Sequence, residues 1–108
     1  MSTKANLVVD QGTTFTTTLS ITDDDGNTID LTGYTGAAQL RKHYTSSRAV
    51  NFTAEVNEAL GEVTLSLTAV QTGNIVAGRY VYDCELTRAD KVSRVLEGIV
   101  TVTPQVTR

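Results

Sequence analysis

The side chains that most often carry catalysis are few in this 108-residue chain, and each stands alone. His43 is the only histidine and Cys84 is the only cysteine. A Ser-His-Asp or Cys-His arrangement would have to be built around His43, and no nucleophile lies in a Gly-x-Ser-x-Gly setting. Cys84 lies on the apolar side of an alternating segment, where a free thiol is usually buried and inert. We therefore predict no catalytic residue and no enzymatic activity.

An acidic run at residues 23–25 invites a calcium interpretation, because hard cations bind carboxylate oxygens. An EF-hand loop with its sixth-position glycine at Gly26 would begin at Ile21, whose side chain cannot bind a cation. A different site that uses these carboxylates with Asp30 stays open, but the Asp-Gly pair favours a solvated hairpin turn. One cysteine excludes a disulfide framework and a multi-cysteine zinc site. We predict no metal and no cofactor.

Positive charge gathers in one segment of a chain whose net charge is −3. The residues of this segment, named the basic patch below, are Arg41, Lys42, His43, Tyr44 and Arg48. One interpretation is a contact site for an acidic partner or a phosphate. The other is an ordinary exposed strand end and loop. The patch is the protein-contact site that the sequence predicts.

Composition excludes several classes of partner. Hydrophobic residues make up 40% and charged residues 19% of the chain, which is typical of one globular domain. The net negative charge argues against nucleic acid, since binding it needs a basic surface. No apolar run approaches the roughly 20 residues that cross a bilayer, so no membrane partner is expected. The first residues carry no apolar stretch typical of a secretory signal, which predicts synthesis in the cytoplasm without a signal peptide.

Periodicity predicts an all-β chain. Thr and Val dominate, and β-branched residues suit the pleated, half-buried surface of a sheet. Apolar runs and apolar–polar alternation predict strands over 7–9, 13–22, 37–43, 50–56, 62–67, 78–86 and 92–102. Thr68 and Gln71 have the spacing of a capping box, which predicts one short helical turn. Residues 88–91 are expected to form a four-residue hairpin loop. Apolar residues on both parities around Gly98 indicate a bulge or a doubly buried stretch there.

Seven to eight short strands at this spacing predict one immunoglobulin-like antiparallel β-sandwich over residues 1–108. Extended terminal arms at 1–9 and 100–108 are expected as sites for strand addition by a neighbour. Such sandwiches carry a tyrosine whose hydroxyl bonds to upstream backbone near the start of strand F, the tyrosine corner. Tyr82 stands at the expected offset, two residues before Cys84, and Tyr80 is the competing candidate. The tryptophan and the paired cysteines of antibody domains are missing from the sequence.

Six segments carry a resemblance to a known family, and their order and spacing are more specific than any one of them. They are 9–15, 25–34, 37–42, 65–69, 77–83 and 97–104. Together they resemble small structural proteins of tailed bacteriophages, notably those of T4-like marine cyanophages. They are also similar to the immunoglobulin-like N-terminal domains of phage baseplate upper proteins. The resemblance covers nearly the whole chain and carries over no catalytic residue.

The resemblance implies a virion component without enzymatic activity, in several copies that contact other virion proteins. A tail, baseplate or fibre-attachment module is the leading expectation. A capsid decoration protein would use the same sandwich on a different lattice. An alternative of another class is a carbohydrate-binding or adhesion domain in which Tyr34, Tyr44 and Tyr80 meet a glycan. An aromatic content of 6% and the lack of tryptophan weigh against that alternative.

Overall fold

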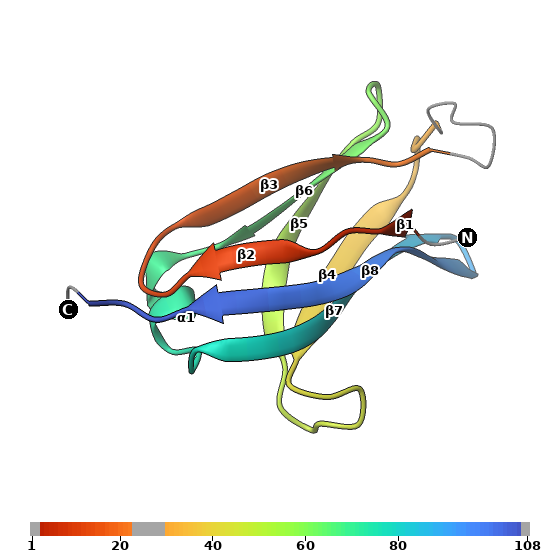
Figure 1. The fold of residues 1–108 in the computed structure, drawn as a ribbon. Coiled ribbons are helices and arrows are strands. Elements are labelled where there is room, and N and C mark those ends of the chain that lie inside the picture. Colours follow the sequence, from red (N-terminus) through yellow and green to blue (C-terminus); the bar gives the residue numbers. More distant parts are fainter. Residues whose placement is uncertain (1–2, 23–29, 107–108) are drawn as a thin grey trace.

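Alternating burial along the strands builds two layers that face each other across a common core. The computed structural model describes residues 3–22 and 30–106. Its elements, labelled in Figure 1, are β1 Thr3–Lys4, β2 Leu7–Asp10, β3 Phe15–Ser20, β4 Thr35–Arg41, β5 Val50–Asn57, β6 Glu62–Leu67, α1 Ala69–Gly73, β7 Gly78–Arg88 and β8 Lys91–Thr103. The acidic turn expected at residues 23–27 lies outside the described residues.

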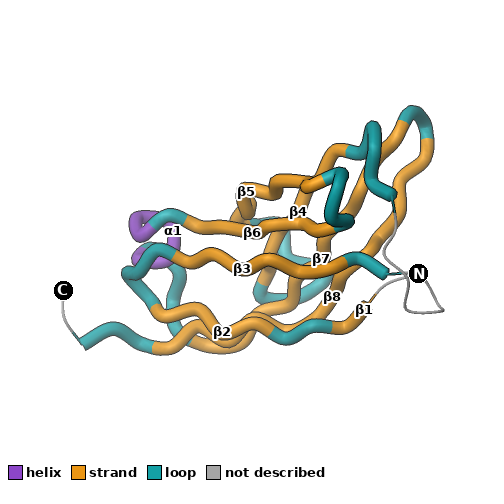
Figure 2. Tube along the Cα trace, turned by 90° about the horizontal axis from the view of Figure 1, so that it is seen from above, coloured by secondary structure: helices purple, strands orange, loops and turns teal. Residues whose placement is uncertain are grey.

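One hydrogen-bonded path joins the strands in the order β1-β8-β7-β4-β5-β6-β3, and β2 also pairs with β8. β5 belongs to both layers, because residues 50–52 pair with β4 while residues 53–57 pair with β6. The first layer therefore contains β1, β2, β8, β7 and β4, and the second contains β6 and β3 (Figure 2). This arrangement confirms the predicted immunoglobulin-like sandwich with one short helical turn.

The core lies between the layers and follows the parity that the sequence predicts. The side chains of β6 alternate, so that Val63, Leu65 and Leu67 are buried. The ring of Phe52 packs edge-on against Tyr82, with 6.0 Å between the ring centroids. The remaining core side chains with almost no exposed surface are Val9, Leu31, Leu40, Cys84, Leu86, Leu96, Val100 and Val102. Burial of these apolar side chains is the main favourable contribution to folding.

The predicted capping box forms at the start of α1. The Thr68 hydroxyl accepts a hydrogen bond from the Gln71 amide at 3.2 Å, and the Gln71 side chain accepts one from the Thr68 amide at 2.9 Å. The buried Thr72 hydroxyl donates to the carbonyl of Thr13 at 2.7 Å, so the helical turn is tied to the β2–β3 connection. This bond holds α1 against the end of the sandwich at which β7 begins.

The two ends of the chain pair with each other. β2 runs parallel to β8, with Leu7 opposite Val100 and Val9 opposite Val102. All four side chains are buried, because their inward parity brings apolar groups together. The arms expected at 1–9 and 100–108 are therefore not free over residues 3–9 and 100–103. The sheet is also not purely antiparallel, since β1 pairs parallel to β8 as well.

The bulge predicted around Gly98 lies three residues earlier, at Val95, and a different constraint acts at Gly98 itself. The register between β7 and β8 shifts between Cys84 and Glu85, so Val95 and Leu96 are both buried. At Gly98 the N-terminal backbone comes so close that a Cβ would lie 2.2 Å from the carbonyl oxygen of Ala5. Glycine is required here because no side chain fits between the two backbones.

Three hydrogen bonds hold the N-terminal segment at this point. The Ala5 amide donates to Glu97 O at 2.9 Å, and the Tyr82 hydroxyl donates to Ala5 O at 2.6 Å. The Asn6 side chain accepts from the Ile99 amide at 3.1 Å. We call Ala5, Asn6, Tyr82, Gly98 and Ile99 the N-terminal latch.

The hairpin between β7 and β8 is tighter than predicted. Arg88 pairs with Lys91, which leaves a loop of two residues, Ala89 and Asp90, instead of four. Ala89 adopts a φ of 53°. Arg88 and Lys91 belong to the ladder and not to the loop, because they pair with each other across the two strands. At its other end, β8 stops at Thr103, directly before Pro104, which has no amide hydrogen to donate.

Gly98→Ala is expected to lower the free energy of unfolding by about 2 kcal/mol, because the new methyl group displaces the Ala5 backbone. Urea denaturation measures the change. Gly73→Ala is the matched control, since its Cβ would meet only Gly12 Cα at 3.8 Å and alanine suits a helix. Equal stability of the wild type and Gly98→Ala would contradict the close approach.

Tyr82→Phe removes the hydroxyl that donates to Ala5 and leaves the ring packing in place. We expect a loss of about 1 kcal/mol in the free energy of unfolding, the usual contribution of one buried hydrogen bond. The control is Tyr44→Phe, because Tyr44 is 73% exposed and makes no such bond. If both variants unfold at the wild-type urea concentration, the Tyr82–Ala5 bond does not stabilise the fold.

Candidate protein-contact site

The basic patch covers the end of β4 and the β4–β5 loop, residues 42–49, which projects from one side of the sandwich (Figure 1). The loop is shaped by a turn in which the Ser46 amide donates to His43 O at 3.0 Å. The His43 amide donates in return to the Ser46 hydroxyl, also at 3.0 Å. This pair of bonds satisfies backbone groups that have no strand partner and presents the side chains of the loop to solvent.

Arg41 holds the loop in place. Its guanidinium donates to Ser46 O and, at 3.0 Å, to the side-chain oxygen of Gln39. Gln39 donates in turn to the Asn51 side chain at 2.7 Å, so one chain of hydrogen bonds joins the loop to β4 and β5. Arg41 is predicted as a contact residue, and these bonds show that it also positions the loop.

Lys42 lies over an aromatic ring at the start of β7. Its Nζ is 5.0 Å from the centroid of Tyr80, a distance at which a cation is attracted to the ring face. The Tyr80 hydroxyl donates to the carbonyl of Val76, four residues upstream, and burial raises the pKa of this phenol. The Lys42 ammonium is thereby held above the corner where α1 leads into β7.

The tyrosine corner is therefore formed by Tyr80, the competing candidate, and not by Tyr82. Tyr80 is the third residue of β7, close enough to the preceding loop for its hydroxyl to reach Val76. Tyr82 is opposite Gly98, and its hydroxyl reaches Ala5 instead. Burial, with a smaller contribution from Cys84, raises the pKa of Tyr82 to about 12.

A groove of about 940 Å³ separates the β4–β5 loop from the connection between α1 and β7. Basic side chains from one wall and apolar side chains from both walls meet in it. The lining residues that matter below are Lys42, Arg48, Val50, Ile75, Val76 and Tyr80. Val76 is 77% exposed. Ile75 and Val76 are not among the contact residues that the sequence predicts. The only signal for their place beside the loop is the tyrosine corner, which fixes the start of β7.

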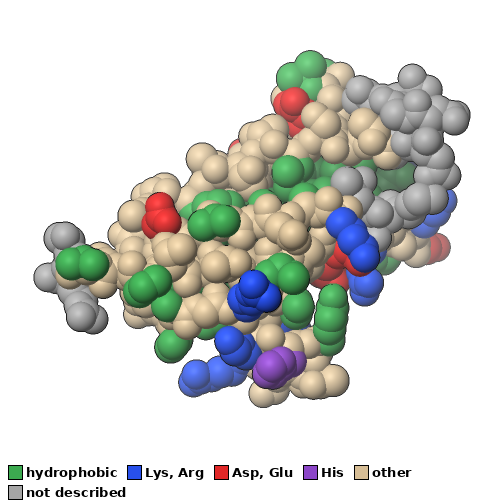
Figure 3. All heavy atoms as spheres, viewed as in Figure 1, with side chains coloured by type: hydrophobic (Ala, Val, Ile, Leu, Met, Phe, Trp, Pro, Cys, Tyr) green, Lys and Arg blue, Asp and Glu red, His purple; other side chains and the backbone are tan. Residues whose placement is uncertain are grey.

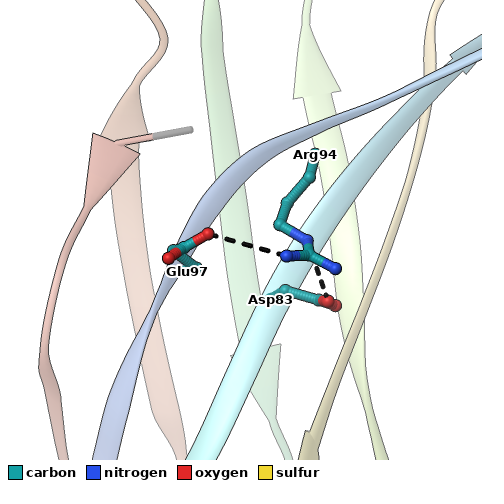
Figure 4. A network of polar contacts seen from close by, with 3 residues as sticks. All are labelled: Asp83, Arg94 and Glu97. Atoms are coloured by element: carbon teal, nitrogen blue, oxygen red, sulfur yellow. Dashed lines mark ion pairs between the residues drawn. The ribbon is translucent and has the colours of Figure 1, made fainter. Parts of the chain in front are cut away.

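The cations of the groove have no acidic partner among residues 3–22 and 30–106. The ion pairs there join Arg94 to Asp83 at 3.3 Å and to Glu97 at 3.7 Å (Figure 4). Neither Lys42 nor Arg48 takes part in them. Figure 3 shows Lys and Arg side chains gathered beside a histidine at the lower edge of one face. The patch therefore presents positive charge to solvent in an otherwise acidic protein.

The remaining candidates for chemistry stay apart from one another. Cys84 is buried, and burial, with the carboxylates of Asp83 and Glu85, raises the pKa of its thiol to about 11. His43 is exposed and hydrogen-bonds through its backbone. No group of three or more His, Cys, Asp or Glu residues gathers in the described part of the chain. The calcium interpretation involves residues 23–25, which lie outside it.

Asp30 and two of the tyrosines already have local partners. The Asp30 carboxylate accepts hydrogen bonds from the side chain and the backbone amide of Thr32, which lower its pKa. The Arg88 guanidinium lies 5.8 Å from the centroid of the Tyr34 ring, and Lys42 covers Tyr80. Cations therefore lie over two of the three tyrosine rings named for a glycan, and the third, Tyr44, is exposed.

Comparison with known proteins agrees with the class that the topology defines, an immunoglobulin-like β-sandwich. The crystal structure of Listeria monocytogenes InlP is similar, with a TM-score of 0.52 and 16% sequence identity. The match covers 94% of this chain and 28% of that one, so the chain spans little more than a quarter of its length. No protein-family model and no curated protein matches. A likeness at this identity shows the fold alone.

No helix in the described residues is long and apolar enough to cross a membrane.

Arg41→Ala is expected to release the β4–β5 loop, because it removes the bonds to Ser46 and Gln39. We expect faster hydrogen exchange of the Ser46 amide and a loss of about 1 kcal/mol in unfolding free energy. Arg48→Ala, which removes an exposed cation, should change neither quantity. Unaltered exchange at Ser46 in Arg41→Ala would remove the positioning role.

Proposed function

We propose that this chain is a non-enzymatic structural module of a tailed-bacteriophage particle, which binds an acidic segment of a neighbouring virion protein through its basic patch. The resemblance of six sequence segments to phage structural proteins supports the particle. One observation carries the contact: Lys42 and Arg48 flank an open groove without an acidic partner in the described residues. Exposed charge of one sign beside apolar surface is suited to a complementary segment.

The groove fits an extended segment that carries both carboxylates and apolar side chains. Carboxylates would meet Lys42 and Arg48 on one wall, and apolar groups would cover Val76 on the other. Tyr44, exposed on the same loop, adds the kind of aromatic surface that is enriched at protein interfaces. Because the loop is held by Arg41, little conformational freedom is lost on binding.

A tail, baseplate or fibre-attachment position is our first proposal, and capsid decoration uses the same contact on a different lattice. In either case the chain is present in several copies, so modest individual contacts add up through avidity. A glycan-binding role receives less support, because basic side chains cover the rings of Tyr34 and Tyr80.

Lys42→Glu combined with Arg48→Glu should lower incorporation into phage particles about tenfold, which corresponds to a loss of about 1.4 kcal/mol in binding. Mass spectrometry of purified particles, separated into heads and tails, measures incorporation and location. The matched control is Arg79→Glu with Lys91→Glu, which changes the net charge equally at exposed sites outside the groove. Undiminished incorporation of the groove variant excludes the patch. Absence of the wild-type chain from both heads and tails excludes the virion role.

A further inference from the structure

β3 is an edge strand at the end of the hydrogen-bonded path. It pairs with β6 over its whole length, from Phe15 opposite Leu67 to Ser20 opposite Glu62. No other strand in the described residues pairs with it, and Figure 1 shows it along the upper margin of the sandwich. Its outer backbone groups are thus available to another strand.

The backbone groups that point outward can be identified from one hydrogen bond. The Ile21 amide donates to Gly61 O at 2.8 Å, directly beyond the end of the β3–β6 ladder. In an antiparallel pair, every second residue bonds to its neighbour and the residues between turn their N–H and C=O groups away. The groups of Thr16, Thr18 and Ser20 therefore face the free edge, and all three residues are exposed.

This edge lacks the features that normally prevent strand addition. Residues 15–20 contain no charged residue, no proline and no glycine, and the ladder to β6 has no bulge. The opposite end of the path differs, because Lys4 and Asp10 place charges on β1 and β2. β3 also carries Phe15 and Leu19 on its inner side, where they are only partly buried.

We propose that β3 pairs antiparallel with β3 of a second copy of this chain, with a twofold axis at Thr18. Thr16 is then opposite Ser20 of the second copy, and Thr18 is opposite Thr18, so that outward-facing backbone groups meet on both sides. On the inner side, Thr17 is opposite Leu19 of the second copy. Pairing joins the second layer of each copy into one continuous sheet. It also covers the part of the Leu19 side chain that is exposed in each single copy.

The second copy is favoured as occupant because the strand is self-complementary. A two-fold arrangement brings the same patch to both sides, so any charge on the edge would meet a like charge. β3 carries none. Hydroxyl groups also continue across the outer face, where Thr18 already bonds to Thr64 with 2.9 Å between the oxygens. The groove of the basic patch is lined by other elements and stays open in each copy, so this pairing is independent of the proposed function.

Sedimentation equilibrium of the intact chain tests the pairing. The wild type should dimerise with a Kd below about 1 mM. Thr18→Lys and Thr18→Glu should each be monomeric, since like charges meet at the axis, whereas an equimolar mixture of the two should regain the dimer. Thr53→Lys and Thr53→Glu are the controls, because Thr53 is exposed on the same layer but lies on β5, away from the edge. Both control variants should remain dimeric.

A second measurement checks the register without charge. Thr18→Cys should form a disulfide between two copies on mild oxidation, because Cα atoms in such a pair are about 5.5 Å apart, a distance that a disulfide spans. Thr53→Cys should not, and the native Cys84 is buried. A monomeric wild type at about 1 mM overturns the proposal, as does a dimer that persists in Thr18→Lys or a mixture that stays monomeric.

Discussion

The close approach of the N-terminal backbone to β8 at Gly98 is the contact on which the rest of the structure depends. No disulfide closes this sandwich, so its first strands must be held by the core and by hydrogen bonds. Leu7 and Val9 are buried in the core, and Ala5 and Asn6 make the hydrogen bonds. A side chain at Gly98 would separate the two backbones and expose this part of the core.

The same contact determines which surfaces remain open. Because the N-terminal segment pairs with β8 in the first layer, it does not pair with β3, and no strand of residues 3–22 and 30–106 covers the outer edge of the second layer. The latch also involves the Tyr82 hydroxyl, whereas the Tyr80 hydroxyl bonds to Val76 in the corner beside the basic patch. The two tyrosines of β7 thus serve separate contacts, one with the N-terminal segment and one in the groove wall.

The two surfaces differ in chemistry. The groove carries cations and apolar side chains, so salt should weaken the contact with an acidic segment that we propose there. The edge of β3 offers neutral backbone donors and acceptors, and salt should affect it little. In the assembly that we propose, the groove serves a neighbouring protein and the edge serves a second copy.

Local patterns in the sequence predicted the elements whose causes are local. Strands β5 and β6 alternate cleanly because each has one buried face, and the capping box of Thr68 depends on residues three apart. The parallel pairing of Leu7 with Val100 joins residues from opposite ends of the chain, and no local pattern encodes it. The same reason explains the errors at Gly98 and Tyr82, whose partners lie in the N-terminal segment. The groove was missed because it exists only once β7 is placed beside the β4–β5 loop.

Hydrogen exchange at the amides of Ala5 and Gln11, followed residue by residue by NMR, tests the central claim most directly. The Ala5 amide, which precedes β2, donates to Glu97 O at 2.9 Å. The Gln11 amide, which follows β2, donates to Thr103 O at 3.0 Å. We expect both to exchange as slowly as the amides of the central strands, because they open only when the sandwich unfolds. Exchange at the rate of an unstructured chain would contradict the account.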